Sequence, residues 1–117
     1  MPVNKKIMEL TKTIIDINGN PAQQRYTEDV YDEDGNKSQK ISSKDLTLSS
    51  AIIDAVLIQV DPDNINEKDH LMRYGIYLKV KEGNSDFTEE EISLIKSCIV
   101  KRYVPLFAGQ LLTLINE

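Results

Sequence analysis

The sequence has few of the residue types on which catalytic and metal sites depend. Its 117 residues include one cysteine, Cys98, one histidine, His70, and no tryptophan. A lone cysteine cannot form an internal disulfide, and the paired Cys and His ligands of a zinc site are absent from the sequence. The longest nearly apolar stretch, residues 51–60, contains Asp54 and Gln59 and is far shorter than the ~20 residues that a membrane-spanning helix needs. We therefore expect no membrane association.

Charge and composition narrow the class of protein further. The chain has 14 Lys and Arg against 19 Asp and Glu, a net charge of -5, which argues against a protein that works mainly by covering phosphates. No apolar run follows Lys5 and Lys6 that could serve as a signal peptide, so a cytoplasmic location is expected. A hydrophobic share of 40% is ordinary for a globular protein, and the length predicts one domain, residues 1–117.

The N-terminal third has the features of extended structure. Residues 7–17 are rich in β-branched side chains and end in an Asn-Gly turn signal, so they predict a strand. A second strand is predicted over 25–31, which gives a β-hairpin region at 7–31. Residues 32–45 are almost all polar or charged and begin with an acidic turn, and we interpret them as a projecting hairpin tip or a mobile loop.

Apolar residues recur at helical spacing after position 46. Thr47 is placed to cap a first helix, whose broad apolar stripe predicts a central position packed on two sides. A second helix is predicted over 67–81, ended by Gly83. Its expected core face consists of Leu71, Tyr74, Gly75 and Leu78.

The third helix has a clear beginning. Thr88 and Glu91 have the spacing of a capping box, and the expected apolar face is formed by Ile92, Ile95, Cys98, Ile99 and Tyr103. Pro105 breaks the chain and suits the first turn of a fourth helix that extends to the end of the sequence. The predicted fold is α+β: a small N-terminal β-hairpin packed on a bundle of three to four helices at 46–117.

Candidate reactive groups have structural explanations. His70 is expected on the polar surface of the second helix, and Cys98 is expected in the core because it lies on an apolar stripe in mid-helix. Two acidic loops crowd oxygen ligands together, but neither matches a calcium-loop template, and turn formation explains them better. These loops contain Asp32, Asp34 and Gly35, and Asp61, Asp63, Asn64 and Asn66. We expect no catalytic, metal or cofactor site, and an enzyme is disfavoured.

Two surfaces are candidates for binding. The first is a set of aromatic and basic residues that would grip single-stranded nucleic acid, although the acidic total makes this unfavourable: Tyr74, Tyr77, Tyr103, Arg73, Lys101 and Arg102. The second is an apolar surface on the fourth helix that a second copy or a protein partner would cover. Its candidate residues are Leu106, Gly109, Leu111, Leu112, Leu114 and Ile115.

The order of these features resembles a group of small uncharacterised phage and prophage proteins. The resemblance lies in an N-terminal strand pair, the Leu46-Thr47-Leu48 opening of the first helix, and segments 68–78, 87–96 and 104–110. It covers about residues 46–117 and implies no catalytic residues. The long acidic turn at 28–36 departs from the shorter hairpin of that group.

The expected function is a non-enzymatic interaction or regulatory protein, phage-encoded if the resemblance holds, that acts through helical surfaces and self-associates. Its location would then be the host cytoplasm. The alternatives are a nucleic-acid-associated accessory factor and a chaperone or other assembly protein for virion parts.

Overall fold

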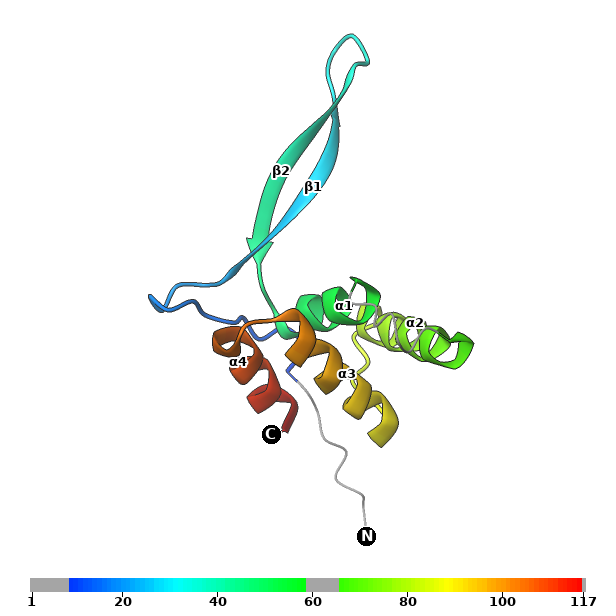
Figure 1. The fold of residues 1–117 in the computed structure, drawn as a ribbon. Helices are drawn as coiled ribbons and strands as arrows, with labels where there is room; N and C mark the ends of the chain where they lie inside the picture. Colours follow the sequence, from blue (N-terminus) through cyan, green and yellow to red (C-terminus); the bar gives the residue numbers. More distant parts are fainter. Residues whose placement is uncertain (1–8, 59–65, 117) are drawn as a thin grey trace.

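A β-hairpin precedes four helices in the structure, a computed structural model that describes residues 9–58 and 66–116 (Figure 1). This arrangement confirms the predicted α+β class. The strands are β1 (Gln23–Tyr31) and β2 (Lys37–Asp45), and they pair antiparallel from Gln23 opposite Asp45 to Tyr31 opposite Lys37. The helices are α1 (Leu48–Ile58), α2 (Glu67–Lys81), α3 (Glu89–Arg102) and α4 (Pro105–Asn116).

The predicted helix boundaries follow from local capping. Gly83 has a φ of +77°, and its amide donates to the Val80 carbonyl while the Asn84 amide donates to the Lys79 carbonyl. This pair of bonds is the Schellman motif that ends a helix at a left-handed residue, as predicted for α2. The capping box of α3 is also confirmed, because Thr88 and Glu91 each accept the backbone amide of the other through their side chains.

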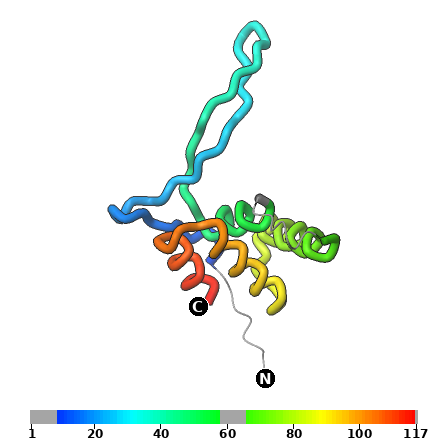
Figure 2. The backbone as a smooth tube through the Cα atoms, viewed as in Figure 1, coloured from blue at the N-terminus to red at the C-terminus, as the bar shows by residue number. Residues whose placement is uncertain are grey.

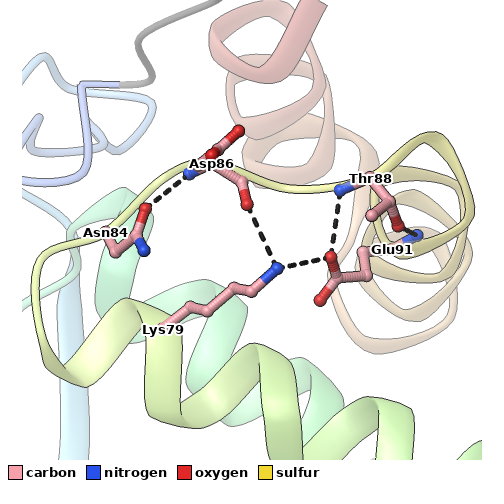
Figure 3. A network of polar contacts seen from close by, with 5 residues as sticks. All are labelled: Lys79, Asn84, Asp86, Thr88 and Glu91. Atoms are coloured by element: carbon pink, nitrogen blue, oxygen red, sulfur yellow. Dashed lines mark hydrogen bonds and ion pairs between the residues drawn. The ribbon is translucent and has the colours of Figure 1, made fainter.

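A polar network fixes the short connection between α2 and α3 (Figure 3). The Lys79 ammonium group lies 2.7 Å from Oε1 of Glu91 and also donates to the Asp86 carbonyl. Burial alone would raise the pKa of Glu91, but the hydrogen bonds from Lys79 and from the Thr88 backbone lower it below its usual value. Glu91 therefore remains ionised and joins the start of α3 to the last turn of α2.

The core is built around α1, which contacts α2, α3 and α4. This position confirms the expectation that the first helix is central. Leu48, Ile52 and Val56 of α1 are fully enclosed. Their neighbours come from every other helix and from the segment before β1, and the buried set includes Leu10, Ile14, Ile76, Ile95, Ile99, Leu111 and Ile115.

The predicted core face of α2 is wrong. Leu71, Tyr74 and Leu78 are exposed, and the buried residues of this helix are Arg73, Ile76 and Val80. Arg73 can be buried because its Nε pairs with Asp69 at 2.7 Å and its Nη1 donates to the Val56 carbonyl near the end of α1. The apolar stripe that the sequence shows on α2 therefore faces away from the core.

Two expectations for the N-terminal third are also corrected. Of predicted strand 7–17, the described part forms isolated bridges, Thr13 with Thr47 and Ile15 with Pro21, rather than a strand. The predicted loop at 32–45 contains the whole of β2 and is a turn only at 32–36. The hairpin therefore spans 23–45 rather than 7–31. The loop predicted at 61–66 lies outside the described residues except for Asn66, which caps α2.

The hairpin extends away from the helices (Figures 1 and 2). Neither strand contains a buried residue, so the hairpin is not packed on the helical bundle as the sequence suggested. Within the part of the chain that is described, no helix is long and apolar enough to cross a bilayer.

Candidate functional site: a projecting hairpin arm

The most prominent surface feature is the hairpin of residues 23–45, which we call the arm. Each strand has nine residues, and at a rise of about 3.3 Å per residue the arm is about 30 Å long. An isolated two-stranded hairpin is only marginally stable in water because it lacks a third layer. The arm therefore depends on its turn, on its root, and on anything that covers its faces. We use the word root for the base of the arm around Ile14, Ala22 and Leu46, where it joins the helical body.

The turn at the arm's tip is well specified. Asp32 accepts the amides of Asp34 and Asn36 through its carboxylate, and its backbone carbonyl accepts the Gly35 amide. Gly35 has a φ of +79°, so the tip is a three-residue loop in which a type I turn precedes a left-handed glycine. Turn formation thus accounts for the first acidic loop, as expected from the sequence.

The same turn occurs a second time, before the arm begins. Asp16 accepts the amides of Asn18 and Asn20 with its carboxylate, and Gly19 has a φ of +81°. The two turns share the pattern Asp-x-x-Gly-Asn at 16–20 and 32–36. One reverses the chain at the root and the other reverses it at the tip, so this repeated pentapeptide sets both ends of the segment that contains β1.

Both faces of the arm carry large apolar side chains. Residues directly opposite in an antiparallel pair share a face, so Tyr26 and Val30 lie on one face with Ser42 and Ser38. On the other face Ile41 is 71% exposed and Tyr31 is 64% exposed. Enclosing one such side chain against a partner is worth about 1.5–3 kcal/mol. The arm therefore offers binding energy on two sides.

Charge is unevenly distributed along the arm. Between positions 28 and 34 there is no lysine or arginine, and the acidic residues there are Glu28, Asp29, Asp32, Glu33 and Asp34. The other strand contributes two lysines to this outer part, Lys40 opposite Glu28 and Lys37, which pairs with Asp29 at 3.4 Å. The half nearer the helices carries Arg25 and Lys44, and the Lys44 ammonium group lies 5.5 Å from the Tyr26 ring. The outer part of the arm is consequently negative.

Buried backbone hydrogen bonds hold the arm at its root. Ile14 donates to the Leu46 carbonyl, Leu46 donates to the Ala22 carbonyl, and Ala22 donates to the Ile14 carbonyl, at 2.7–2.8 Å. All three residues are buried. These bonds form a closed ring that joins the segment before the arm to both of its ends. Because a buried amide without a partner is costly, the ring fixes the place where the arm leaves the body.

Helix α4 supports the root from the side. Oε1 of Gln110 accepts the Ile15 amide at 3.0 Å, and Nε2 of Gln110 donates to the Ile15 carbonyl at 2.8 Å. This amide side chain pairs with the Ile15 backbone as a neighbouring strand would. The root is therefore tied to α4 as well as to α1.

A buried carboxylate lies beside the foot of the arm. Asp54 of α1 accepts from Nε of Arg102 and from the Tyr103 hydroxyl, both at 2.8 Å. Burial and the hydrogen bond to Asp54 raise the pKa of Tyr103 far above its ordinary value, so the hydroxyl remains a donor. A cleft of about 280 Å³ at this point is lined by these residues and by Gln24 and Arg25 of β1. The network joins α1 to the α3–α4 junction below the arm.

The candidate interface on α4 is largely internal. Leu111 and Ile115 are fully buried in the core, so they cannot form the surface that the sequence suggested. Leu112 and Leu114 are half-buried against that core, whereas Leu106 and Gly109 are exposed. The apolar side chains of this helix thus mostly fill the chain's own interior.

Two of the other candidate reactive groups lie where the sequence predicts them. His70 is exposed, as expected, and burial raises the pKa of the Cys98 thiol, which lies in the core as predicted. Among residues 9–58 and 66–116, no three His, Cys, Asp or Glu side chains are grouped to hold a metal ion. Most of the second acidic loop lies outside the described residues.

Most of the proposed nucleic-acid residues already have partners within the chain. The guanidinium groups of Arg73 and Arg102 are paired with Asp69 and Asp54, and the Tyr103 hydroxyl is bonded to Asp54. Tyr74 and Tyr77 lie near each other on α2, with ring centres 6.1 Å apart. Arginines that are ion-paired within the chain, and a tyrosine whose hydroxyl is hydrogen-bonded, do not form the basic and aromatic groove that binds single-stranded nucleic acid.

Comparison with known proteins provides no relative for this chain: neither a family model, nor a curated protein, nor a solved structure matches it.

Proposed function

We propose that the chain is a non-enzymatic interaction protein whose projecting arm binds a partner protein. The observation that carries this proposal is the exposure of both arm faces, each with an aromatic and an aliphatic side chain. A chain that needed the arm only for its own stability would pack one face on its helices, as antiparallel sheets generally do. The ring of hydrogen bonds at the root instead holds the arm away from the body.

The chemistry of the arm indicates the kind of surface it fits. The acidic outer part with Tyr31 suits a partner surface that is positively charged and contains an apolar pocket. Tyrosine is well suited to such a contact because it combines a large apolar area with a polar end and few rotatable bonds. The groove between the foot of the arm and α1, about 490 Å³ in volume, extends the contact surface toward Ile53 and Leu57.

The competing nucleic-acid function is less consistent with this arm. A hairpin that enters a groove of DNA or RNA approaches closely spaced phosphates and needs basic side chains. Here the outer part, residues 28–40, carries five acidic residues against two lysines, and one of these, Lys37, is paired with Asp29. Assembly of virion parts is compatible with an arm of this kind, and with the phage origin suggested by the sequence resemblance, and it is retained as a more specific form of the same proposal.

The test is co-purification of the tagged chain from its native host, with two paired variants. Tyr31→Ser with Ile41→Ser removes apolar contacts from one face of the arm. The matched control, Val100→Ser with Val104→Ser, removes two valines on and just after α3 that are 59% and 60% exposed. We expect a partner that is recovered with the wild type and the control but lost with the arm variant. Equal recovery with all three chains would contradict the proposal.

A charge variant tests the chemistry of the partner. Glu33→Lys with Asp34→Lys reverses two tip charges and spares Asp32, whose carboxylate holds the turn. Partner binding should weaken, and its dependence on salt concentration should fall, because fewer complementary charges meet. Binding of DNA or RNA that strengthens with this variant and weakens with added salt would favour the nucleic-acid alternative.

A further inference from the structure

A second exposed apolar surface lies on α2, away from the arm. Leu71 is 62% exposed, Tyr74 is 55% exposed and Leu78 is 39% exposed. Their spacing of three and four residues places them on one side of the helix. Figure 1 shows α2 and the arm extending from the helical body in different directions. We call Leu71, Tyr74, Gly75 and Leu78 the α2 stripe.

Gly75 lies in the middle of this stripe, and nothing in residues 9–58 and 66–116 requires a glycine there. Its φ is not positive, and a Cβ added there would meet nothing within 4 Å. Glycine destabilises a helix interior relative to alanine. Alanine at this position would therefore stabilise α2, and there is space for its Cβ. A missing side chain allows another helix to approach closely. Close approach by a second molecule would explain why a glycine occupies this position.

The ends of the stripe carry opposite charges. Glu67 and Lys81 continue the same alternation of three and four residues as Leu71, Tyr74 and Leu78, one in the first turn and one in the last. Both are exposed, and the Lys81 ammonium group lies 5.7 Å from the Tyr77 ring. In an antiparallel pair of α2 helices, Glu67 of each copy would face Lys81 of the other. A parallel pair would bring like charges together.

From these observations we infer that the α2 stripe is the interface of a two-fold symmetric dimer, in which the α2 helices of two copies of this chain pack antiparallel. A two-fold axis perpendicular to the helix pairs the stripe with itself, as an isologous interface requires. Gly75 admits the close contact, and the terminal charges select the antiparallel orientation. The inference does not depend on the partner of the arm, and a dimer of this kind would carry two arms.

The size of the helix sets the expected affinity. Its 15 residues span about 22 Å, so one helix pair covers less area than the interface of a tight complex. We therefore expect dissociation in the micromolar range or weaker, which sedimentation equilibrium of the purified chain between about 5 and 500 µM can measure. A chain that remains monomeric over this whole range would overturn the inference.

Substituting the glycine separates interface contact from helix stability. Gly75→Ala should raise the melting temperature of the monomer by about 2–4 °C, because alanine favours the helix, and should weaken the dimer at least about tenfold. Gly109→Ala is the matched control, since Gly109 is also a glycine within a helix with nothing within 4 Å of an added Cβ. It should stabilise the monomer without changing the dimer. A dimer weakened by the Gly109 variant and not by the Gly75 variant would place the interface on α4 and refute the inference.

Charge exchange tests the orientation. Glu67→Lys and Lys81→Glu should each weaken the dimer, and the double variant should recover most of the loss because each end then again carries opposite charges. Leu71→Glu should abolish dimerisation, with at least about a hundredfold change in the dissociation constant because the substitution occurs twice per dimer. No recovery in the double variant, or a dimer that persists in Leu71→Glu, would contradict antiparallel packing through this stripe. If the dimer is lost while partner binding remains, the proposed function of the arm is unaffected. If partner binding is lost while the dimer remains, the inference of a dimer is unaffected.

Discussion

Gln110 offers the sharpest test of how the arm is held, because one side chain of α4 makes two hydrogen bonds to the backbone of one residue at the root. These bonds, at 3.0 and 2.8 Å, join Oε1 and Nε2 of Gln110 to the amide and the carbonyl of Ile15. Each such bond contributes about 0.5–1.5 kcal/mol, and the partial solvent exposure of this pair favours the lower part of that range. Gln110→Ala should therefore lower the free energy of unfolding by about 1–2 kcal/mol.

The measurement is urea denaturation followed by circular dichroism, with amide hydrogen exchange as a local readout. A loss of that size corresponds to a fall of about 4–8 °C in melting temperature for a domain of this length. Gln110→Met preserves the length of the side chain and removes both bonds, so it should show a similar loss. The amide of Ile15 should exchange faster in both variants while amides in the middle of α1 remain protected.

Thr113 provides the control on the same helix. Its hydroxyl donates to the Gly109 carbonyl, one turn earlier, and makes no other hydrogen bond within the part of the chain that is described, so Thr113→Ala should change stability by no more than about 0.5 kcal/mol. Equal stability of the Gln110 and Thr113 variants, with unchanged exchange at Ile15, would show that α4 does not support the root.

Three further substitutions probe the polar groups in the interior. Asp54→Ala should lower the free energy of unfolding by about 2–3 kcal/mol, because it leaves the Tyr103 hydroxyl and the Arg102 guanidinium without their shared acceptor. Tyr103→Phe should lower it by about 1–2 kcal/mol. Denaturation of both variants and of the double variant measures the coupling between the two residues, and strictly additive losses would contradict the network. The pKa of Glu91 is lower in the folded chain than its ordinary value of 4.5, so its ionised form stabilises the fold above that pH and the contribution disappears as the pH falls through the folded pKa. The stability advantage of the wild type over Glu91→Gln should thus be constant near neutral pH and shrink below pH 4.5; an advantage that grows in acid would contradict this assignment.

The sequence predicts the helices well because local signals determine where they begin and end. Thr88 with Glu91 marks the start of α3, Gly83 marks the end of α2, and Pro105 marks the start of α4. These signals act through backbone groups within one turn, so they need no knowledge of the remainder of the fold. The central place of α1 is also predictable, because few of its side chains are polar.

The face that α2 presents to the core could not be predicted in the same way. Hydrophobicity favours Leu71, Tyr74 and Leu78, but the helix buries Ile76 and Val80 together with Arg73. An arginine enters the core only because Asp69 and the Val56 carbonyl are positioned to accept its hydrogen bonds. That arrangement is a property of the packed structure, and composition alone gives no sign of it.

The sequence predicts the arm only in part, for a related reason. Strand prediction relies on the alternation of apolar residues on a buried face with polar residues on an exposed face. However, β2 has a single large apolar residue, Ile41, and both faces of the hairpin are exposed. The signal that would have located it is the turn at 32–36, whose Asp-x-x-Gly-Asn pattern also occurs at 16–20. A three-residue turn of this type pairs the residues on either side of it, which would have placed β2 opposite β1.

Excision of the arm tests most directly whether it is an appended binding element. Residues 25–43 can be replaced by Asn-Gly, because Gln24 and Lys44 are directly paired and a two-residue turn joins such a pair. The root ring of Ile14, Ala22 and Leu46 is retained. We predict a chain with unchanged helical circular dichroism and a melting temperature within about 5 °C of the wild type that no longer captures its partner. An unfolded helical body, or a shortened chain that still binds the partner, would contradict the account.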